Sequence, residues 1–174
     1  MSNQEEIIKN LSQSWPMPSK MSPVIIIGTG GIVKDAHLPA YKKSGFNVLG
    51  LYDVDNEKAE LLAKEYEIKN VFHSLEEAFE NKDCIFDLAL PPANLLEVVE
   101  KLPEDIYAIF QKPLGRSLEE GNKIRKICHQ KNINASMNFQ LRFSPIMLPV
   151  YEAIKNNLLG ELVELEVHVN THTP

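Results

Sequence analysis

The sequence predicts a doubly wound α/β fold, in which a parallel sheet is covered by helices on both of its faces. Short apolar runs such as Val24–Ile27 and Tyr107–Phe110 alternate with stretches in which apolar residues recur at helical spacing. Strands buried on both faces have this continuous apolar character, whereas strands with one wet face alternate. The regular succession of such strands and helices is typical of a parallel sheet with crossover helices.

The composition indicates a globular protein that is not built for nucleic acids. The chain has 174 residues, of which 44% are hydrophobic, which suffices for one ordinary domain and the beginning of a second. Lys and Arg number 18 against 24 Asp and Glu, a formal net charge of −6, and no basic cluster stands out. Because binding to a phosphate backbone needs concentrated positive charge, we expect no nucleic-acid partner.

The cysteines and the lengths of the apolar runs indicate the cellular compartment in which the protein is expected. Cys84 and Cys128 lie far apart and lack the spacing of a metal site or a redox motif, so we interpret both as buried free thiols and predict no metal site. Few cysteines suit a reducing compartment. No apolar run approaches membrane-spanning length, and the N-terminus lacks the apolar core of a signal peptide. We therefore expect a cytoplasmic protein without a membrane partner.

The first 20 residues are interpreted as an N-terminal arm. Ile7, Ile8 and Leu11 fall at helical spacing, so a short helix is expected before the prolines at positions 16 and 18. Trp15 could dock this arm onto the body of the protein or onto a second subunit.

Residues 21–140 are predicted to form the α/β domain. Two capping boxes, Ser74 with Glu77 and Ser117 with Glu120, mark the starts of two helices. The strands are expected at 24–27, 48–52, 71–72, 84–90, 107–110 and 133–139, and the other helices at 56–66, 95–102 and directly after the glycines that follow the first strand.

The pattern changes after residue 140. A helix is expected from Ser144 to about Asn156, and the segment Leu162–Asn170 then alternates apolar and polar residues. That period predicts a strand with one buried and one wet face. We interpret residues 141–174 as the beginning of a second, α+β domain that is cut short. A lone strand would expose its edge and its apolar face, so this segment should fold back, belong to a larger sheet, or pair with a second copy in a homo-oligomer.

The most specific local signal is the glycine cluster after the first strand. Gly28 and Gly30 follow a strand and open a helix, and Asp53 ends the next strand about 20 residues further on, as in the dinucleotide-binding fingerprint. Gly28 permits the tight turn, and Gly30 lets the backbone approach a pyrophosphate. The amides of Gly30, Gly31 and Ile32 would present the positive end of the helix to phosphate. The pattern predicts a Rossmann domain that binds a nicotinamide dinucleotide.

Asp53 favours NAD over NADP. Its carboxylate would accept hydrogen bonds from both hydroxyls of the adenosine ribose and would repel a 2′-phosphate. The next residue, Val54, supplies no cation that could attract one. Val33 stands at the third glycine position and is expected to widen the spacing between helix and strand slightly. The alternative, a glycine turn in another doubly wound fold, does not account for Asp53.

Further stretches have the order and spacing of one enzyme family. The glycine segment, with Thr29 as its second residue, runs on to His37–Ala40; Gln111–Gly115 follows the fifth strand, and Asn138–Pro145 precedes the second domain. Together these stretches resemble the glucose–fructose oxidoreductase/inositol dehydrogenase/MocA family of nicotinamide oxidoreductases. Gln111–Gly115 is similar to its Glu-Lys-Pro motif.

The resemblance implies a substrate domain built on an open antiparallel sheet, and a sugar, a polyol or a related alcohol or ketone as substrate. It implies that Lys112 is catalytic, because an ammonium there could polarise a carbonyl or stabilise an alkoxide. Asn94 is equally well explained as a cap of the helix expected at Leu95. The residues expected to contact the cofactor are Gly28, Thr29, Gly30, Gly31, Ile32, Asp53, Val54, Leu90, Pro91, Pro92, Asn94, Gln111, Lys112, Asn138 and Arg142.

Two departures from the family leave an alternative open. Gln111 stands where the motif has an acidic residue, although an amide can still hydrogen-bond a ribose hydroxyl. The downstream Asp and His that complete proton transfer in the family have no counterpart in these residues. The sequence therefore predicts an NAD-dependent oxidoreductase or, alternatively, a non-catalytic NAD-binding module or truncated remnant. His37, beside Pro39 at an expected helix break, is interpreted as a packing or capping residue.

Overall fold

The computed structural model describes residues 3–168 and 170. The chain divides into two compact units, which are described one at a time. The larger unit comprises residues 18–138, and the smaller unit combines residues 1–17 with residues 139–174. That domains of the whole protein begin after residues 20 and 140 stays a prediction.

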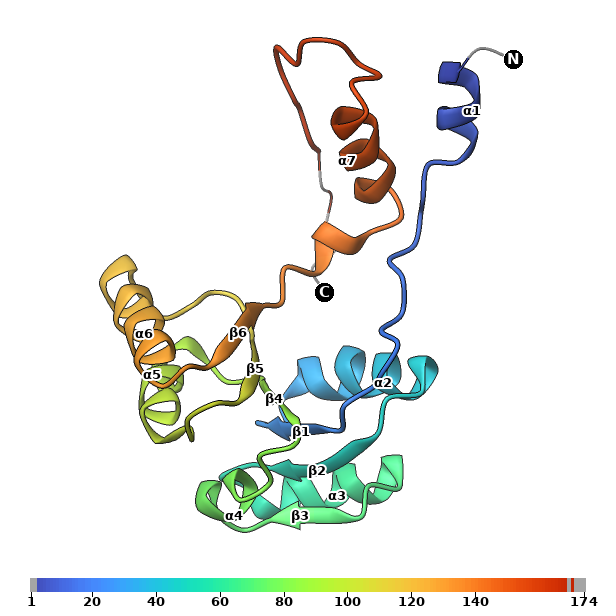
Figure 1. The fold of residues 1–174 in the computed structure, drawn as a ribbon. Helices are drawn as coiled ribbons and strands as arrows, with labels where there is room; N and C mark the ends of the chain where they lie inside the picture. Colours follow the sequence, from blue (N-terminus) through green and yellow to red (C-terminus); the bar gives the residue numbers. More distant parts are fainter. Residues whose placement is uncertain (1–2, 169, 171–174) are drawn as a thin grey trace. The chain divides into compact units, whose positions relative to one another are not determined.

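The larger unit holds one sheet of six parallel strands, ordered β3-β2-β1-β4-β5-β6 (Figure 1). This is the strand order of the Rossmann fold, and it confirms the predicted fold class. The chain reverses direction across the sheet between β1 and β4, and ligands of such folds bind beyond the carboxyl ends of the strands at that point. The strands are β1 (Val24–Ile27), β2 (Val48–Tyr52), β3 (Asn70–Phe72), β4 (Ile85–Leu88), β5 (Tyr107–Phe110) and β6 (Asn134–Met137).

Helices connect the strands and cover the sheet (Figure 1). Those of the larger unit are the π-helical segment η1 (Val33–His37), α2 (Leu38–Ser44), α3 (Asn56–Tyr66), α4 (Leu75–Phe79), α5 (Pro92–Lys101) and α6 (Leu118–Gln130). The smaller unit contains α1 (Asn3–Lys9), the 3-10 segment η2 (Gln140–Phe143) and α7 (Met147–Lys155). None of the described helices is both long and apolar enough to span a membrane.

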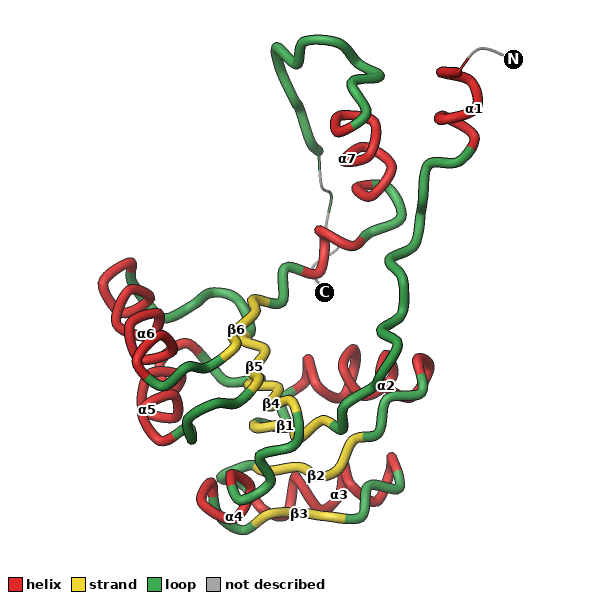
Figure 2. Tube along the Cα trace, viewed as in Figure 1, coloured by secondary structure: helices red, strands yellow, loops and turns green. Residues whose placement is uncertain are grey.

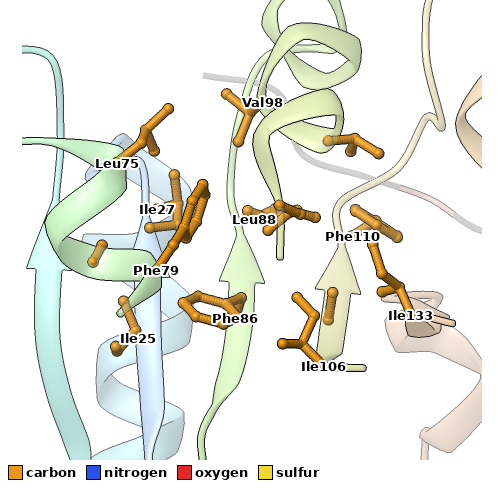
Figure 3. Close-up of a cluster of buried hydrophobic side chains, with 14 of the residues drawn as sticks. Ile25, Ile27, Leu75, Phe79, Phe86, Leu88, Val98, Ile106, Phe110 and Ile133 are labelled. Atoms are coloured by element: carbon orange, nitrogen blue, oxygen red, sulfur yellow. The ribbon is translucent and has the colours of Figure 1, made fainter. Parts of the chain in front are cut away.

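The continuous apolar strands arise because the sheet has a core on each face. Side chains alternate between faces along a strand. Accordingly, Ile25 and Ile27 of β1 pack in a cluster with residues of α4, α5 and α6 (Figure 3), whereas Val24 and Ile26 pack on the opposite face with residues of η1, α2 and α3. All four side chains are buried. A strand between two cores has no wet face, which is why it lacks polar alternation.

Both predicted capping boxes are present. The hydroxyl oxygens of Ser74 and Ser117 accept from the amides of Glu77 and Glu120, at 3.1 and 3.2 Å. Each glutamate carboxylate accepts from the amide of the residue before the serine, at 2.7 and 2.5 Å. These bonds satisfy amides that the first turn of a helix leaves without partners.

The helix break expected near Pro39 is wrong. The chain is helical from Gly31 to Ser44, and the segment just before the proline, Val33–His37, is π-helical. A proline lacks an N–H and crowds the carbonyl four residues earlier. The wider π turn accommodates that crowding and lets the helix continue.

The strand expected over Leu162–Asn170 is also wrong for the residues that the structure describes. Residues 162–168 and 170 form an exposed loop after α7 (Figure 2), and residue 169 lies outside the described part. Alternation selects which face of a strand is apolar, but strand structure also needs a neighbouring backbone to take up the amides and carbonyls. Pairing of this segment with a second copy of the chain stays a prediction.

The N-terminal arm packs within the smaller unit. The rings of Trp15 and Phe143 meet edge to face with 5.3 Å between centroids. The amide of Ser12 donates to the Glu152 carboxylate at 2.8 Å. Trp15 could dock onto its own chain or onto a second subunit, and its contact with Phe143 lies within the same chain.

Replacement of Gly28 should destabilise the fold, whereas replacement of Gly30 should not. Gly28 has φ +95°, and a Cβ built there would lie 2.6 Å from the carbonyl oxygen of Ala89. Gly28→Ala is therefore expected to lower the free energy of unfolding by about 2 kcal/mol or more, as strained backbone and a steric clash require. A Cβ on Gly30 meets no atom of the described residues within 4 Å, so Gly30→Ala should change the free energy of unfolding by less than about 1 kcal/mol. Urea unfolding followed by circular dichroism measures both, and equal losses would contradict the prediction.

Candidate functional site

The glycine loop ends in amides that have no partner in the fold. The loop Gly28–Gly30 follows β1, and the carbonyl of Gly30 accepts from the amides of Val33 and Lys34 at 3.0 and 3.2 Å. The amides of Gly30, Gly31 and Ile32 meet no acceptor among the described residues. They form the positive end of a helix that continues to Ser44. Such an end can bind a phosphate group.

Asp53 is tied to the glycine loop by Thr29. The Asp53 Oδ2 atom accepts from both the amide and the hydroxyl of Thr29, at 2.6 and 2.7 Å, and Oδ1 accepts from the amide of Asp55 at 3.0 Å. A carboxylate has about four acceptor positions. One position on Oδ1 therefore remains for a ribose hydroxyl, and a second hydroxyl would have to take the place of Thr29 Oγ1. Thr29 itself is buried.

These bonds keep Asp53 ionised. Partial burial by itself raises the pKa of Asp53, but the hydrogen bonds from the Asp55 amide and from the hydroxyl and amide of Thr29, aided by the charge of Lys58, outweigh it and hold the pKa below its ordinary value of 3.8. The site thus presents a fixed negative charge next to free backbone amides.

A cleft of about 420 Å³ lies between the glycine loop and α3. Its wall includes two lysines that the sequence analysis missed, Lys34 and Lys58. Lys34 forms an exposed ion pair with Glu65 at 3.6 Å. The position of Lys58 near Asp53 could have been predicted, because Lys58 lies in the first turn of the helix that Asp55 caps directly after Asp53. The lining residues are Thr29, Gly30, Gly31, Lys34, Asp55, Glu57, Lys58, Leu61, Leu62 and Glu65.

Leu90 borders the same strand edge from the other side. A Cβ on Gly28 would lie 3.1 Å from Leu90 Cδ2, so the end of β4 is in close contact with the glycine loop. Pro91 caps α5, and Pro92 begins it. Asn94 is therefore inside the first turn with an exposed side chain and is not a helix cap. Its contact with the cofactor stays a prediction.

Gln111 and Lys112 follow β5 at the same edge of the sheet. Gln111 is half-buried, and its backbone N–H donates to the Leu88 carbonyl at 3.3 Å. The Lys112 side chain is exposed, and the peptide bond between Lys112 and Pro113 is cis. The loop is anchored at its far end by the guanidinium of Arg116, which contacts the buried Glu120 carboxylate at 3.0 Å. Hydrogen bonds from Arg116 hold the pKa of Glu120 below its ordinary value.

His37 is buried at the N-cap position of α2, where its ring packs edge to face on Tyr41 and its side chain makes no capping hydrogen bond. Its Nδ1 lies 2.7 Å from Asp87 Oδ2, the Tyr41 hydroxyl donates to the same oxygen at 2.9 Å, and its Nε2 lies 3.1 Å from Gln111 Nε2. His37 and Asp87 are buried, and burial together with the charge of Asp87 raises the pKa of Tyr41 far above its ordinary value. Sequence reasoning missed Asp87, although an aspartate within the apolar run 84–90 was the available signal.

Asn138 and Arg142 belong to different units. The backbone N–H of Asn138 donates to the Phe110 carbonyl at 2.8 Å, just beyond the end of β6. Arg142 lies in η2, with its guanidinium carbon 6.0 Å from the ring centre of Phe143. Val54, in contrast, follows Asp53 directly and is 91% exposed. The cofactor contacts expected of these three residues stay predictions.

The cysteines are buried and free, as predicted. Burial raises the pKa of the Cys84 thiol to about 12 and shifts that of Cys128 in the same direction. Buried thiols with raised pKa values are poor nucleophiles. Among the described residues, no three His, Cys, Asp or Glu side chains lie close enough together to hold a metal ion.

The comparison with protein families agrees with this geometry. The model of an oxidoreductase family with an NAD-binding Rossmann fold, GFO/IDH/MocA, matches residues 23–139, more than half of the chain. The chain belongs to this family. The resemblance inferred from the glycine loop and the Gln111–Gly115 motif is thereby confirmed.

Individual relatives are distant and longer. A glucose-6-phosphate 3-dehydrogenase from Bacillus subtilis is 26% identical over 149 residues, which cover 85% of this chain and 42% of that protein. A solved oxidoreductase from Thermotoga maritima is 25% identical with a TM-score of 0.71, covering 82% of this chain and 45% of that one. A super-repressor mutant of Gal80p from Saccharomyces cerevisiae shares the fold at 22% identity and a TM-score of 0.71, over 82% of this chain and 40% of that one. The chain thus spans less than half the length of these relatives.

Loss of the Thr29 hydroxyl should weaken the fold in a pH-dependent way. Thr29→Val removes one hydrogen bond to the ionised Asp53, so we expect the pKa of Asp53 to rise and the free energy of unfolding at pH 7 to fall by about 1 kcal/mol. Because the folded-state pKa of Asp53 is depressed, this contribution is present above pH 3.8 and is lost as the pH falls below that value. Urea unfolding between pH 7 and pH 2.5 measures it.

Thr29→Ser keeps the hydroxyl and is the matched control, with an expected change below about 0.5 kcal/mol. A stability difference between Thr29→Val and wild type that stays the same down to pH 2.5 would show that the bond to Asp53 is not its source.

Proposed function

We propose that this chain forms the NAD-binding part of a dehydrogenase that acts on a sugar, a polyol or a related alcohol or ketone. The observation that carries this proposal is the row of free amides at Gly30–Ile32 beside the ionised Asp53. Membership of an oxidoreductase family with an NAD-binding Rossmann fold supports it. The name of the Bacillus subtilis relative makes glucose 6-phosphate a first substrate to test.

The residues at the strand edge fit a dinucleotide. The helix start at Gly30 has open space where a side chain would be, so a pyrophosphate can approach its amides. Asp53 can accept from the adenosine ribose through Oδ1. Leu90, Pro91, Pro92 and Asn94 would line the nicotinamide side, with Asn138 contributing from the end of β6. The cofactor contact of Arg142 is proposed from the family resemblance alone.

Lys112 is proposed as the catalytic residue. When bound, the cofactor supplies hydride exchange with a carbinol or carbonyl carbon. The Lys112 ammonium, exposed at the carboxyl end of β5, would donate a hydrogen bond to the oxygen on that carbon, where negative charge develops. An ammonium at this place lowers the energy of an alkoxide without contacting the rest of the substrate.

We prefer NAD to NADP because the ionised Asp53 carboxylate repels a 2′-phosphate. Lys58 and Lys34 line the cleft between the glycine loop and α3, and their positive charges would attract a 2′-phosphate. Lys34 is paired with Glu65, and Lys58 is close enough to Asp53 to lower its pKa. Both lysine charges are thus partly offset by acidic neighbours, and the charge of Asp53 decides the preference.

A second function is a non-catalytic NAD-binding module. Gln111 favours it, because an amide takes the place of the acidic residue beside the catalytic lysine. Either function includes a cytoplasmic location, with which the free, buried cysteines are compatible. Either also includes a homo-oligomer formed through residues 162–170, with which the exposure of the described residues of this segment is compatible.

Binding of the reduced cofactors to the 174-residue chain tests the site. NADH should bind at least about fivefold more tightly than NADPH, equal to about 1 kcal/mol of charge repulsion. Asp53→Asn keeps the shape of the side chain and should narrow this preference. Asp83→Asn, which removes a charge at the amino end of β4, should not. Nicotinamide fluorescence measures all three, and tighter binding of NADPH to the wild type would refute the proposed role of Asp53.

Turnover separates the two functions. With NAD and a panel of sugars, polyols and glucose 6-phosphate, Lys112→Ala should lower NADH production by about 100-fold or more, the usual contribution of a positioned proton donor. Lys126→Ala, an exposed lysine on α6, should leave it unchanged. NADH binding without oxidation of any candidate would favour the non-catalytic module.

A further inference from the structure

A buried carboxylate is joined to the carboxyl edge of the sheet by hydrogen bonds. Asp87 lies in the middle of β4, where its sheet neighbours are Ile26 of β1 and Ile109 of β5. Its side chain is 1% exposed, and its Oδ1 atom has no hydrogen-bond partner among the residues that the structure describes. An ionisable group in such surroundings destabilises a core unless it is well paired. Its retention in this strand therefore calls for a role other than packing.

The two donors to Asp87 use a single oxygen. His37 Nδ1 and the Tyr41 hydroxyl both contact Oδ2, at 2.7 and 2.9 Å. A carboxylate can only accept, so the His37 ring carries a proton on Nδ1. When Nδ1 of a neutral imidazole is protonated, Nε2 is an acceptor.

The acceptor on His37 selects one orientation of Gln111. The amide nitrogen of Gln111 is 3.1 Å from His37 Nε2, so the NH₂ group donates to the ring and the carbonyl oxygen Oε1 is turned away from it. The reverse orientation would bring Oε1 to a bare ring nitrogen, where two acceptors repel. Asp87 thus determines, through one imidazole ring, which end of the Gln111 amide remains available at the end of β5.

We propose that Asp87 and His37 are positioning residues that hold Gln111 with its carbonyl oxygen presented to the ligand, so that this side-chain amide supplies a hydrogen-bond acceptor at the end of β5. A glutamate at position 111 has no N–H for His37 Nε2. The Asp87 carboxyl group lies inside β4, and the contacts of His37 with Asp87 and with Gln111 carry its orienting effect to the end of β5. Use of that oxygen by a cofactor hydroxyl rests on the proposed function, whereas the orientation does not.

The orientation can be measured without any ligand. In the ¹⁵N-labelled 174-residue chain, long-range proton–nitrogen correlation distinguishes protonated from bare ring nitrogens of His37. We expect a proton on Nδ1 and none on Nε2, and Gln111 side-chain protons that exchange with water more slowly than those of the exposed Gln130. A proton on Nε2 at neutral pH would overturn the proposal whether or not the chain binds NADH.

Two matched variants then test the path to the site. His37→Leu and Tyr41→Phe each remove one donor to Asp87 Oδ2, but only the first cuts the connection to Gln111. His37→Leu should weaken NADH binding by about fivefold, the loss expected for one hydrogen bond, and by the same factor as Gln111→Ala. Tyr41→Phe should leave binding unchanged although it also destabilises the fold.

The double variant separates positioning from a general structural effect. If His37 acts through Gln111, His37→Leu combined with Gln111→Ala binds NADH as weakly as Gln111→Ala alone. Losses that multiply would overturn the proposal, as would wild-type affinity in His37→Leu. Should His37→Leu fail to fold, the ring-proton measurement on the wild type still decides the orientation. A wild type that binds no NADH but has the predicted ring proton would refute the proposed function alone.

Discussion

Because Gly28 has no side chain, the ends of β1, β2 and β4 can lie close together at the point where the order of the strands reverses. Its amide donates to the Tyr52 carbonyl at 2.7 Å, which ties the end of β1 to the end of β2. Its α-carbon faces the Ala89 carbonyl, at a distance that leaves no room for a Cβ. A positive φ then turns the chain into the helix. The free amides, Asp53 and the end of β4 lie near one another because this turn is tight.

The polar groups around that turn are arranged at two depths. Thr29 and Asp53 form a shallow pair, and Thr29 lines the cleft beside α3. His37 and Asp87 form a deep pair between the sheet and α2. Burial makes the deep pair costly to assemble and rigid once formed, since a low local dielectric strengthens its hydrogen bonds. The π-helical segment that ends at His37 carries the imidazole to that depth.

The same fold serves proteins with different roles, so the fold alone does not assign an activity. The chain shares it with an oxidoreductase from Thermotoga maritima and with Gal80p. An activity has to be argued from the carboxyl edge of the sheet, where the Asp53 carboxylate lies beside free backbone amides and the Gln111 side chain contacts His37 next to Lys112. Both features suit a dinucleotide, and the second bears on whether the site also carries out a reaction.

Most of the fold could be predicted from the sequence because its signals are local. The ranges of β1, β2, β5 and α3 agree with the predicted ones, since apolar periodicity and capping act within a few residues. The glycine loop and Asp53 were identified for the same reason: a turn that needs a positive φ constrains its own residues. Segment 162–170 was mispredicted because a strand depends on a neighbouring backbone that the pattern cannot specify.

The sequence by itself therefore determined the order of strands and helices, the position of the phosphate-binding turn and the family. Only the tertiary structure decided that Lys34 and Lys58 line the cleft. It also decided that the Thr29 hydroxyl uses one acceptor position of the Asp53 carboxylate. The connection of Asp87 to Gln111 through His37 is likewise a tertiary contact. These contacts join residues from different strands and helices. Their geometry follows from how the helices pack on the sheet, and no periodicity along the chain encodes it.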